Sequence, residues 1–374
     1  MASLSLSSDT PQRRKPTMAA TPASSTSSTS STSSTSSTSP AFSARRSSPY
    51  LPTSRESLLL SIFPALLLFG TLFRVLSPQT RGAAMNVAPG TAHYDQAPGL
   101  APSYFARKDN LFNVFFVKRG WFWITVTFAF FVGTHPFFAV SDKQQPAARN
   151  SSVLGRRGSA ILRWGLVTGW WFLVTQWFFG PALVDRSFRL TGGSCQVLQA
   201  AVDDKIAADE DPSQLLLAAT ASACKHAGGQ WRGGHDISGH VFLLVLGTTF
   251  LAQEIGWVLW RRAVSTSTVR VADARSLVMH DGAVKSAEVE AELATISPSP
   301  ASTETATVAS RIALRFAAVV VGLCLWMLLM TAIYFHTWFE KLTGLLVSLA
   351  GFYSVYLLPR WVPEARRVVG VPGL

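Results

Sequence analysis

The stretch IALRFAAVVVGLCLWMLLMTAIY, residues Ile312–Tyr334, contains one charged residue, Arg315. A run of this length and apolarity is typical of a helix that crosses the hydrocarbon core of a membrane. Other runs of about 17 to 24 residues have the same character. They are Leu58–Leu76, Trp121–Val140, Ile161–Val184, Gly239–Trp260 and Leu342–Leu358. The sequence therefore predicts an all-α integral membrane protein with six transmembrane helices.

The composition agrees with a membrane protein and argues against a soluble one. Of the 374 residues, 48% are hydrophobic and 14% are charged, which is about half the charged share of a typical soluble domain. The formal net charge is +12, but the basic residues lie beside the apolar runs, as at Arg156, Arg157, Arg261 and Arg262. Basic residues in such places set the orientation of a membrane protein and meet anionic lipid headgroups. Nucleic acid is therefore not a predicted partner.

Composition also divides the chain. Residues 1–55 are rich in Ser and Thr, too polar to bury a core, and are predicted to form a disordered cytosolic tail. No cleavable signal peptide is expected, because the first apolar run begins near Leu58 and is long enough to remain as a span. Residues 56–360 form the predicted membrane domain, with a polar cytosolic insertion at 261–311, and residues 361–374 form a C-terminal tail.

Six spans place both termini on the same side of the membrane. The N-terminal tail, the two predicted cytosolic loops and the C-terminus hold more Lys and Arg than segments 77–120 and 185–237, so the termini are expected in the cytosol. The loop 185–237 is then lumenal, and it contains Cys195 and Cys224. A disulfide between them would stabilise the loop by roughly 3 kcal/mol. The alternative is two free thiols, and the spacing does not decide between them.

The segment GGHDISGH, residues Gly233–His240, places two histidines, an aspartate and a serine at the start of an apolar run. Asp236 or Ser238 can cap a helix that begins there. The free backbone N–H groups of its first turn would then form a site for an anion such as phosphate. If the helix includes both Asp236 and His240, which are four positions apart, the carboxylate could orient the imidazole.

A second segment, YFHTWFEK at Tyr334–Lys341, separates the last two apolar runs. The fourth span begins at His240 on the lumenal side, and the fifth span returns there near His336. Both histidines are therefore expected at one membrane face. Two imidazoles there can divide the work of phosphoryl transfer, one attacking phosphorus and the other protonating the leaving oxygen. No ligand spacing predicts a metal, and Glu254 inside the fourth run is expected to have a buried structural partner.

The run GHDISGHVFLL at Gly234–Leu244, followed by YFHTWFEK, resembles the fat storage-inducing transmembrane (FIT) family, in a fungal-type member. The resemblance extends from about residue 55 to 360 and implies a six-span helical bundle similar to lipid phosphatases. It implies a cofactor-free endoplasmic-reticulum enzyme with its active site facing the lumen. Such an enzyme hydrolyses fatty acyl-coenzyme A to acyl 4′-phosphopantetheine and adenosine 3′,5′-bisphosphate, and supports lipid droplet biogenesis and phospholipid homeostasis. By this resemblance His336 is the nucleophile and His240 the acid.

The phosphate-binding motifs of lipid phosphatases are not found in this chain. The chain lacks the Lys-x6-Arg-Pro element of lipid phosphatases, and Met330 stands where an Arg-x5-His motif needs its arginine. Candidate substrate-binding residues are Asp236, Ser238 and Arg232. Further cations in the lumenal loop are candidates by location alone, namely Lys225, Arg186 and Arg189. The acyl chain is expected in the bilayer beside Phe242 and Leu243.

Two other interpretations stay open. The apolar and aromatic excess is also typical of a non-catalytic protein that binds diacylglycerol or triacylglycerol and promotes lipid droplet budding. In that case removal of either histidine would leave the droplet phenotype intact. A weaker alternative takes His240 and His336 as axial haem ligands, which a Soret band would reveal. The sequence identifies no protein partner.

Overall fold

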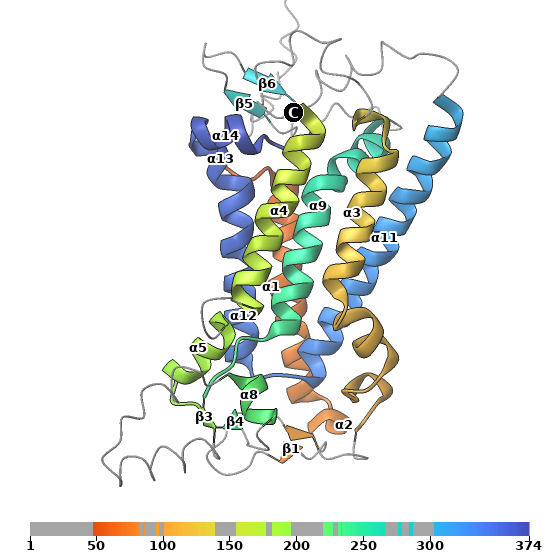
Figure 1. Ribbon diagram of the computed structural model, residues 1–374. Coiled ribbons are helices and arrows are strands. Elements are labelled where there is room, and N and C mark those ends of the chain that lie inside the picture. Colours follow the sequence, from red (N-terminus) through yellow and green to blue (C-terminus); the bar gives the residue numbers. More distant parts are fainter. Residues whose placement is uncertain are drawn as a thin grey trace, which may run out of the picture. The chain divides into compact units, whose positions relative to one another are not determined.

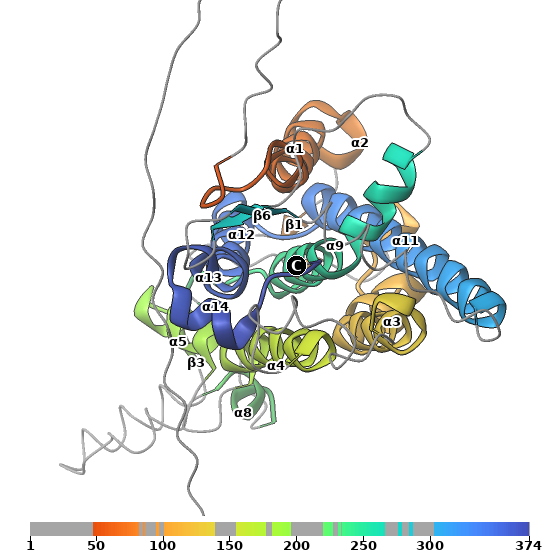
Figure 2. The same cartoon turned by 90° about the horizontal axis from the view of Figure 1, so that it is seen from above.

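The computed structural model describes residues 48–81, 85–86, 95–96, 101–138, 155–176, 182–195, 220–226, 231–232, 234–265, 276–278, 284–286 and 303–373. Nearly all of the predicted N-terminal tail, 1–55, and most of the predicted insertion, 261–311, lie outside these ranges. The long helices run side by side in both views (Figures 1 and 2). They are α1 (Ser54–Leu76), α3 (Gly120–Thr134), α4 (Gly155–Thr175), α9 (Gly239–Ser265), α11 (Thr303–Tyr334) and α12 (Trp338–Phe352).

Four of the described helices are long and apolar enough to cross a membrane, which makes the chain a multi-pass membrane protein. They cover Ser54–Leu76, Gly239–Val258, Val308–Tyr334 and Trp338–Trp361. The predicted second run corresponds to α3, which has 15 residues. The predicted third run corresponds to α4, which ends at Thr175. The next described helix is α5 (Leu183–Leu190). Length and composition thus support four of the six predicted spans.

Shorter elements connect these helices. The helical ones are α2 (Pro78–Arg81), the 3₁₀ turns η1 (Tyr104–Ala106) and η3 (Pro136–Phe138), the π-helices η2 (Phe112–Val117) and η6 (Tyr353–Leu357), α8 (Ala221–His226), α13 (Leu358–Trp361) and α14 (Pro363–Val369). The strands form three antiparallel pairs: β1 (Met85–Asn86) with β2 (Asp95–Gln96), β3 (Ser194–Cys195) with β4 (Trp231–Arg232), and β5 (Ser276–Val278) with β6 (Val284–Ser286).

Helix α9 lies among the other long helices. Figure 2 shows it between α12, α11, α3 and α4, and it contacts all of them. Residues Val241–Leu251 are all buried. A Cβ atom added at Gly344 of α12 would lie 2.8 Å from the carbonyl oxygen of Ser238, and the Ser348 hydroxyl donates to the carbonyl oxygen of Phe242 at 3.0 Å. Small residues on α12 therefore allow its close approach to the start of α9.

The buried charge in α9 has the structural partner that the sequence predicts. The Arg163 guanidinium of α4 donates to both carboxylate oxygens of Glu254, at 2.6 and 2.8 Å. The Tyr356 hydroxyl donates to the same carboxylate at 2.9 Å. Arg163 also donates to the carbonyl oxygen of Val369 in α14 at 2.9 Å. The network joins α4, α9, η6 and α14, so α14, which lies in the predicted C-terminal tail, packs against the long helices.

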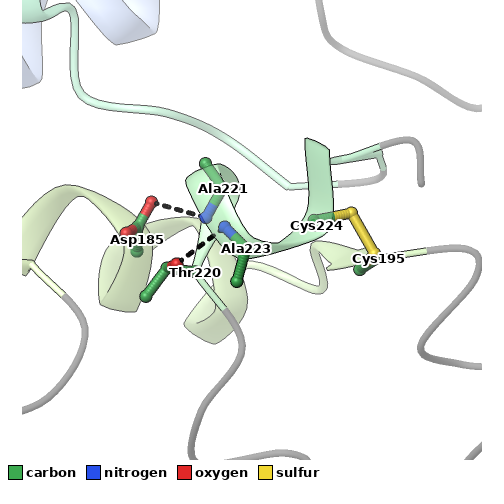
Figure 3. The surroundings of a disulfide bond; sticks show 6 residues. All are labelled: Asp185, Cys195, Thr220, Ala221, Ala223 and Cys224. Atoms are coloured by element: carbon green, nitrogen blue, oxygen red, sulfur yellow. Dashed lines mark hydrogen bonds between the residues drawn. A yellow bond between two sulfur atoms is a disulfide. The ribbon is translucent and has the colours of Figure 1, made fainter. Parts of the chain in front are cut away.

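The loop before α9 contains a disulfide. Cys195 of β3 and Cys224 of α8 are bonded, with Cα atoms 5.8 Å apart, which confirms the bridged alternative (Figure 3). The Asp185 carboxylate of α5 accepts a hydrogen bond from the Ala221 N–H at 3.4 Å in the same region. The pairing of β3 with β4 adds a second connection. Together these contacts hold α5 and α8 at the end of the molecule where α9 begins (Figure 1).

Candidate active site

His240 lies in the first turn of α9, and Ser238 determines where that helix begins. The Ser238 hydroxyl accepts a hydrogen bond from the Val241 N–H at 3.3 Å, which is the contact of an N-cap residue. Its own N–H donates to the carbonyl oxygen of Glu340 at 3.1 Å. Of the two predicted caps, Ser238 is therefore the one that the structure uses. The hydrogen bond from the Ser238 N–H to Glu340 also fixes the start of α9 against the start of α12.

His336 lies between α11 and α12, in a backbone conformation unusual for a side chain of its size. Its φ angle is 58°, in the left-handed region that residues other than glycine seldom adopt. Thr337 and Glu340 form a capping box that begins α12 immediately afterwards. The Glu340 carboxylate accepts from the Thr337 N–H at 2.8 Å and lies 3.3 Å from Nδ1 of His336. The turn and the carboxylate together set the direction of the ring.

The two imidazoles meet, as the order of the spans predicts. Their ring centroids are 5.9 Å apart and the rings are inclined by 54°. The Phe335 ring is stacked on His240 at 6.2 Å. Both histidines are partly buried. The structure thus places two imidazoles, from helices far apart in sequence, close enough to contact one small group; their catalytic role stays a prediction.

His240 is held by a residue that sequence reasoning missed. Its Nε2 lies 2.7 Å from Oδ1 of Asn113, in the π-helix η2. The Asn113 amide nitrogen donates to the carbonyl oxygen of Lys108 at 2.7 Å, which turns Oδ1 toward the ring and makes Nε2 the donor. The expectation that Asp236 orients His240 requires both residues to lie in one helix. Helix α9 begins at Gly239, after Asp236, so this condition is not met, and Asn113 provides the contact with the ring.

The other predicted site residues are placed around the start of α9. Asp236 is partly buried in the non-helical segment before the helix. Ser238 is fully buried, and its hydroxyl serves as the cap. The backbone of Arg232 pairs with Ser194 in the β3–β4 ladder, whereas its side chain lies outside the described residues. Their role in substrate binding stays a prediction.

Two cavities lie beside the histidines. One, of about 630 Å³, is lined by His240 together with Lys118, Arg119, Leu243 and aromatic side chains; we call it the His240 cavity. The other, of about 610 Å³, is lined by Arg74, Lys341, Thr337 and neighbouring residues; we call it the Arg74 cavity.

Cations that line these cavities were not among the predicted phosphate ligands. Lys118 and Arg119 come from the segment before α3, and Arg74 from the last turn of α1. The Arg74 guanidinium donates to the carbonyl oxygen of His336 at 3.2 Å. Within the ranges that the structure describes, no group of three or more His, Cys, Asp or Glu side chains is placed to hold a metal ion.

Comparison with known proteins places this chain in a family. Residues 101–356 match the family described as fat storage-inducing transmembrane protein (FIT). The chain belongs to the FIT family. Among FIT relatives, it is 31% identical to acyl-coenzyme A diphosphatase fit1 of Schizosaccharomyces pombe over 269 residues, 72% of this chain and 78% of that protein.

Relatives from other organisms carry the same name. Acyl-coenzyme A diphosphatase FITM2 of Mus musculus is 26% identical over 258 residues, 69% of this chain and 73% of that protein. Acyl-coenzyme A diphosphatase SCS3 of Saccharomyces cerevisiae is 50% identical over 46 residues, 12% of each chain. No solved structure matches the chain. The part that matches the FIT family includes Asn113, His240 and His336, whereas Arg74 precedes it.

Proposed function

We propose that this chain is an acyl-coenzyme A diphosphatase that hydrolyses fatty acyl-CoA to acyl 4′-phosphopantetheine and adenosine 3′,5′-bisphosphate. The observation that carries the proposal is the pair of imidazoles at 5.9 Å, each with one ring nitrogen held by a neighbouring side chain. The relatives in Schizosaccharomyces pombe and Mus musculus are named for the same activity, which supports the proposal.

The contacts suggest a division of roles. With Nδ1 of His336 directed to Glu340, Nε2 is the nitrogen available to attack phosphorus. In the first step the bond from Nε2 to one phosphorus forms and the bond from that phosphorus to the bridging oxygen breaks. The bridging oxygen leaves with the other phosphate and takes a proton from His240. Water, activated by His240, then hydrolyses the phosphohistidine, which restores both rings and releases the second product.

The acyl chain and the phosphates of the substrate need different environments. The His240 cavity combines the cations Lys118 and Arg119 with apolar walls that reach Leu243 in the membrane-spanning part of α9. We place the acyl chain there, with its phosphate near the cations. Leu243 lines this cavity as expected, whereas Phe242 is fully buried in the core, because it lies on another face of α9. The expected contact with Phe242 is therefore replaced by the aromatic side chains from α3 and α4.

We further propose the finer parts of this function. The chain crosses the endoplasmic-reticulum membrane six times in a bundle like that of lipid phosphatases, with α3 and α4 as the second and third spans. Both termini are cytosolic and the histidines face the lumen. Consumption of acyl-CoA there supports lipid droplet biogenesis and phospholipid homeostasis. The buried pair of Arg163 with Glu254 neutralises a charge that α4 would carry into the membrane.

Purified protein tests the activity directly. It should convert acyl-CoA to the two products without added metal, as followed by phosphorus NMR. His240→Ala and His336→Ala should each abolish turnover while the thermal unfolding temperature in detergent stays near that of the parent protein. His226→Ala is the matched control, because His226 is exposed on α8. Unchanged turnover in either active-site variant would reject the proposal.

The aromatic lining of the His240 cavity also suits a neutral glycerolipid. This observation supports the alternative, non-catalytic function. It predicts that the two His→Ala variants keep their effect on lipid droplets, while Leu243→Arg loses it. The diphosphatase proposal predicts the opposite for the histidine variants. Droplet counts in cells that express each variant as the only copy distinguish the two functions.

A further inference from the structure

The Arg74 cavity has no role in the mechanism above, although Thr337, the residue after His336, lines it. It is lined by Arg74, Lys341 and Thr337, and by Thr191 and His235 from the loop that carries the disulfide. Arg74 is joined directly to the nucleophile's backbone through the carbonyl oxygen of His336. Thr191 accepts from the His235 N–H at 2.7 Å, which fixes the opposite wall. The cavity is therefore shaped by elements from both ends of the sequence.

Two cations line this cavity near the ends of membrane-spanning helices. Lys341 lies in the first turn of α12 and Arg74 in the last turn of α1. Cations at such ends commonly lie at the membrane interface, where they meet anionic groups. Lys341 has a structural explanation, because its ammonium group donates to the carbonyl oxygen of Ala332 at 2.5 Å and to the Thr71 hydroxyl at 3.2 Å. Arg74 is partly exposed in the cavity, where its guanidinium can meet a ligand.

The two cavities can take the two halves of acyl-CoA. The His240 cavity has aromatic walls and Leu243, which suit the acyl chain. The Arg74 cavity is lined by two cations, Arg74 and Lys341, and by three threonines, one of which is Thr337, the residue after His336. A guanidinium binds phosphate with paired N–H donors. The nucleotide half of coenzyme A carries a 3′-phosphate on the same ribose as the diphosphate, so a nucleotide in this cavity would bring that phosphate to Arg74.

Building on the proposed function, we infer that the Arg74 cavity binds the nucleotide half of acyl-CoA and that Arg74 recognises its 3′-phosphate. Arg74 is then a specificity residue for coenzyme A over its 3′-dephospho form. The acyl chain and the nucleotide extend from the histidine pair in different directions, into separate cavities.

The test compares acyl-CoA with acyl-3′-dephospho-CoA on the full-length purified protein. The parent protein should prefer acyl-CoA in kcat/KM. Arg74→Met should lower the ratio of kcat/KM for acyl-CoA to kcat/KM for the dephospho substrate by roughly tenfold or more, while Arg74→Lys should keep part of the preference. Arg107→Met is the matched control, because Arg107 is exposed and pairs with Asp109 on the surface; it should keep the full preference.

The outcomes separate this inference from the proposed function. A parent protein that cleaves neither substrate rejects the diphosphatase activity itself. A parent protein that cleaves both equally, or an Arg74→Met variant that loses both in the same proportion, overturns the 3′-phosphate assignment alone. A measurement without variants also decides: adenosine 3′,5′-bisphosphate should inhibit the parent protein at least roughly tenfold more strongly than adenosine 5′-monophosphate. Equal inhibition would overturn the assignment.

Discussion

At the scale of single residues, the site is two imidazoles that each use one nitrogen for support. His240 is held by the amide of Asn113, and His336 lies beside the carboxylate of Glu340. The support differs in charge, which fits different roles. In the proposed mechanism, a carboxylate beside His336 stabilises the positive charge that its ring gains on attacking phosphorus, whereas a neutral amide orients His240 without a charge of its own.

Glu340 has two functions that substitution can separate. Glu340→Gln keeps an acceptor for the Thr337 N–H, since glutamine also completes a capping box, but removes the charge beside His336. We expect kcat to fall by roughly 100-fold with little change in thermal stability. Glu340→Ala should lose activity and also about 1 kcal/mol of stability, because the cap is lost as well. Turnover assays and thermal unfolding of both variants provide the check; a fully active Glu340→Gln protein would contradict the assigned role.

Asn113 should matter through its contact with His240 and not through the segment that carries it. Asn113→Ala should reduce kcat by roughly 10- to 100-fold, because the imidazole is no longer held for proton transfer, with a smaller effect on KM. Asn110→Ala is the matched control: Asn110 holds the same segment by accepting from the Asn113 N–H at 2.8 Å, away from the ring. Steady-state kinetics of both variants decide. Equal losses would show that only the position of the segment matters.

The sequence predicted the two histidines but not the residues that support them. His240 and His336 each adjoin an apolar run, so counting the spans is enough to bring them to one end of the molecule. Asn113 contacts His240 across 127 positions, and Arg74 contacts His336 across 262. Such pairings depend on which helices are neighbours, and hydrophobic periodicity does not encode this. One signal was present: Asn113 is a polar residue inside the apolar run Phe112–Val117.

At the scale of helices, the distance between the histidines depends on how α12 packs against α9. Gly344→Ala would place a Cβ 2.8 Å from the carbonyl oxygen of Ser238 and 3.2 Å from the Val241 Cβ. We expect a loss of about 1 to 3 kcal/mol of stability and lower kcat, because His240 moves with the start of α9. Gly322→Ala is the control, since a Cβ there meets no atom within 4 Å. Thermal unfolding and turnover test both; an unperturbed Gly344→Ala protein would refute this packing role.

The Arg163–Glu254 ion pair should support folding without affecting chemistry. Glu254 lies fourteen positions after His240, about 21 Å along the helix. Glu254→Gln leaves the buried guanidinium without its carboxylate and should cost roughly 3 kcal/mol, while kcat per folded molecule stays unchanged. Replacing both residues, as Arg163→Met with Glu254→Leu, should recover much of the loss. Unfolding in denaturant measures these differences, and a catalytic defect in folded Glu254→Gln protein would disprove a purely structural role.

The apolar runs predicted where helices lie better than where they end. Helix α12 begins at Trp338, four residues before the run Leu342–Leu358, because the capping box of Thr337 and Glu340 starts it earlier. Helix α3 stops at Thr134, and His135 and the turn η3 follow it. Caps and turns depend on individual hydrogen bonds, which the average apolarity of a window does not resolve. The π-helix η2 escaped prediction for the same reason.

At the scale of the whole molecule, the site, the disulfide and the loop that carries it lie at one end of the long helices. The starts of α9 and α12 lie at that end, near β3, β4 and α8, and α13 and α14 lie at the other (Figure 1). A disulfide persists in an oxidising compartment. The end with the histidines is therefore the one expected to face the lumen.

This orientation makes a prediction that the chain's own sequence can test. The tripeptide Asn150-Ser151-Ser152 is an N-glycosylation acceptor, and it lies in the segment between α3 and α4, expected in the cytosol. Asn150 should therefore carry no glycan. An acceptor introduced into residues 201–219, between the two cysteines, should be glycosylated, and one introduced into residues 287–300 should not. Mobility shifts removed by a glycosidase report each result. A glycan on Asn150, or none on the acceptor between the cysteines, would place the histidine pair on the cytosolic face and reverse the proposed topology.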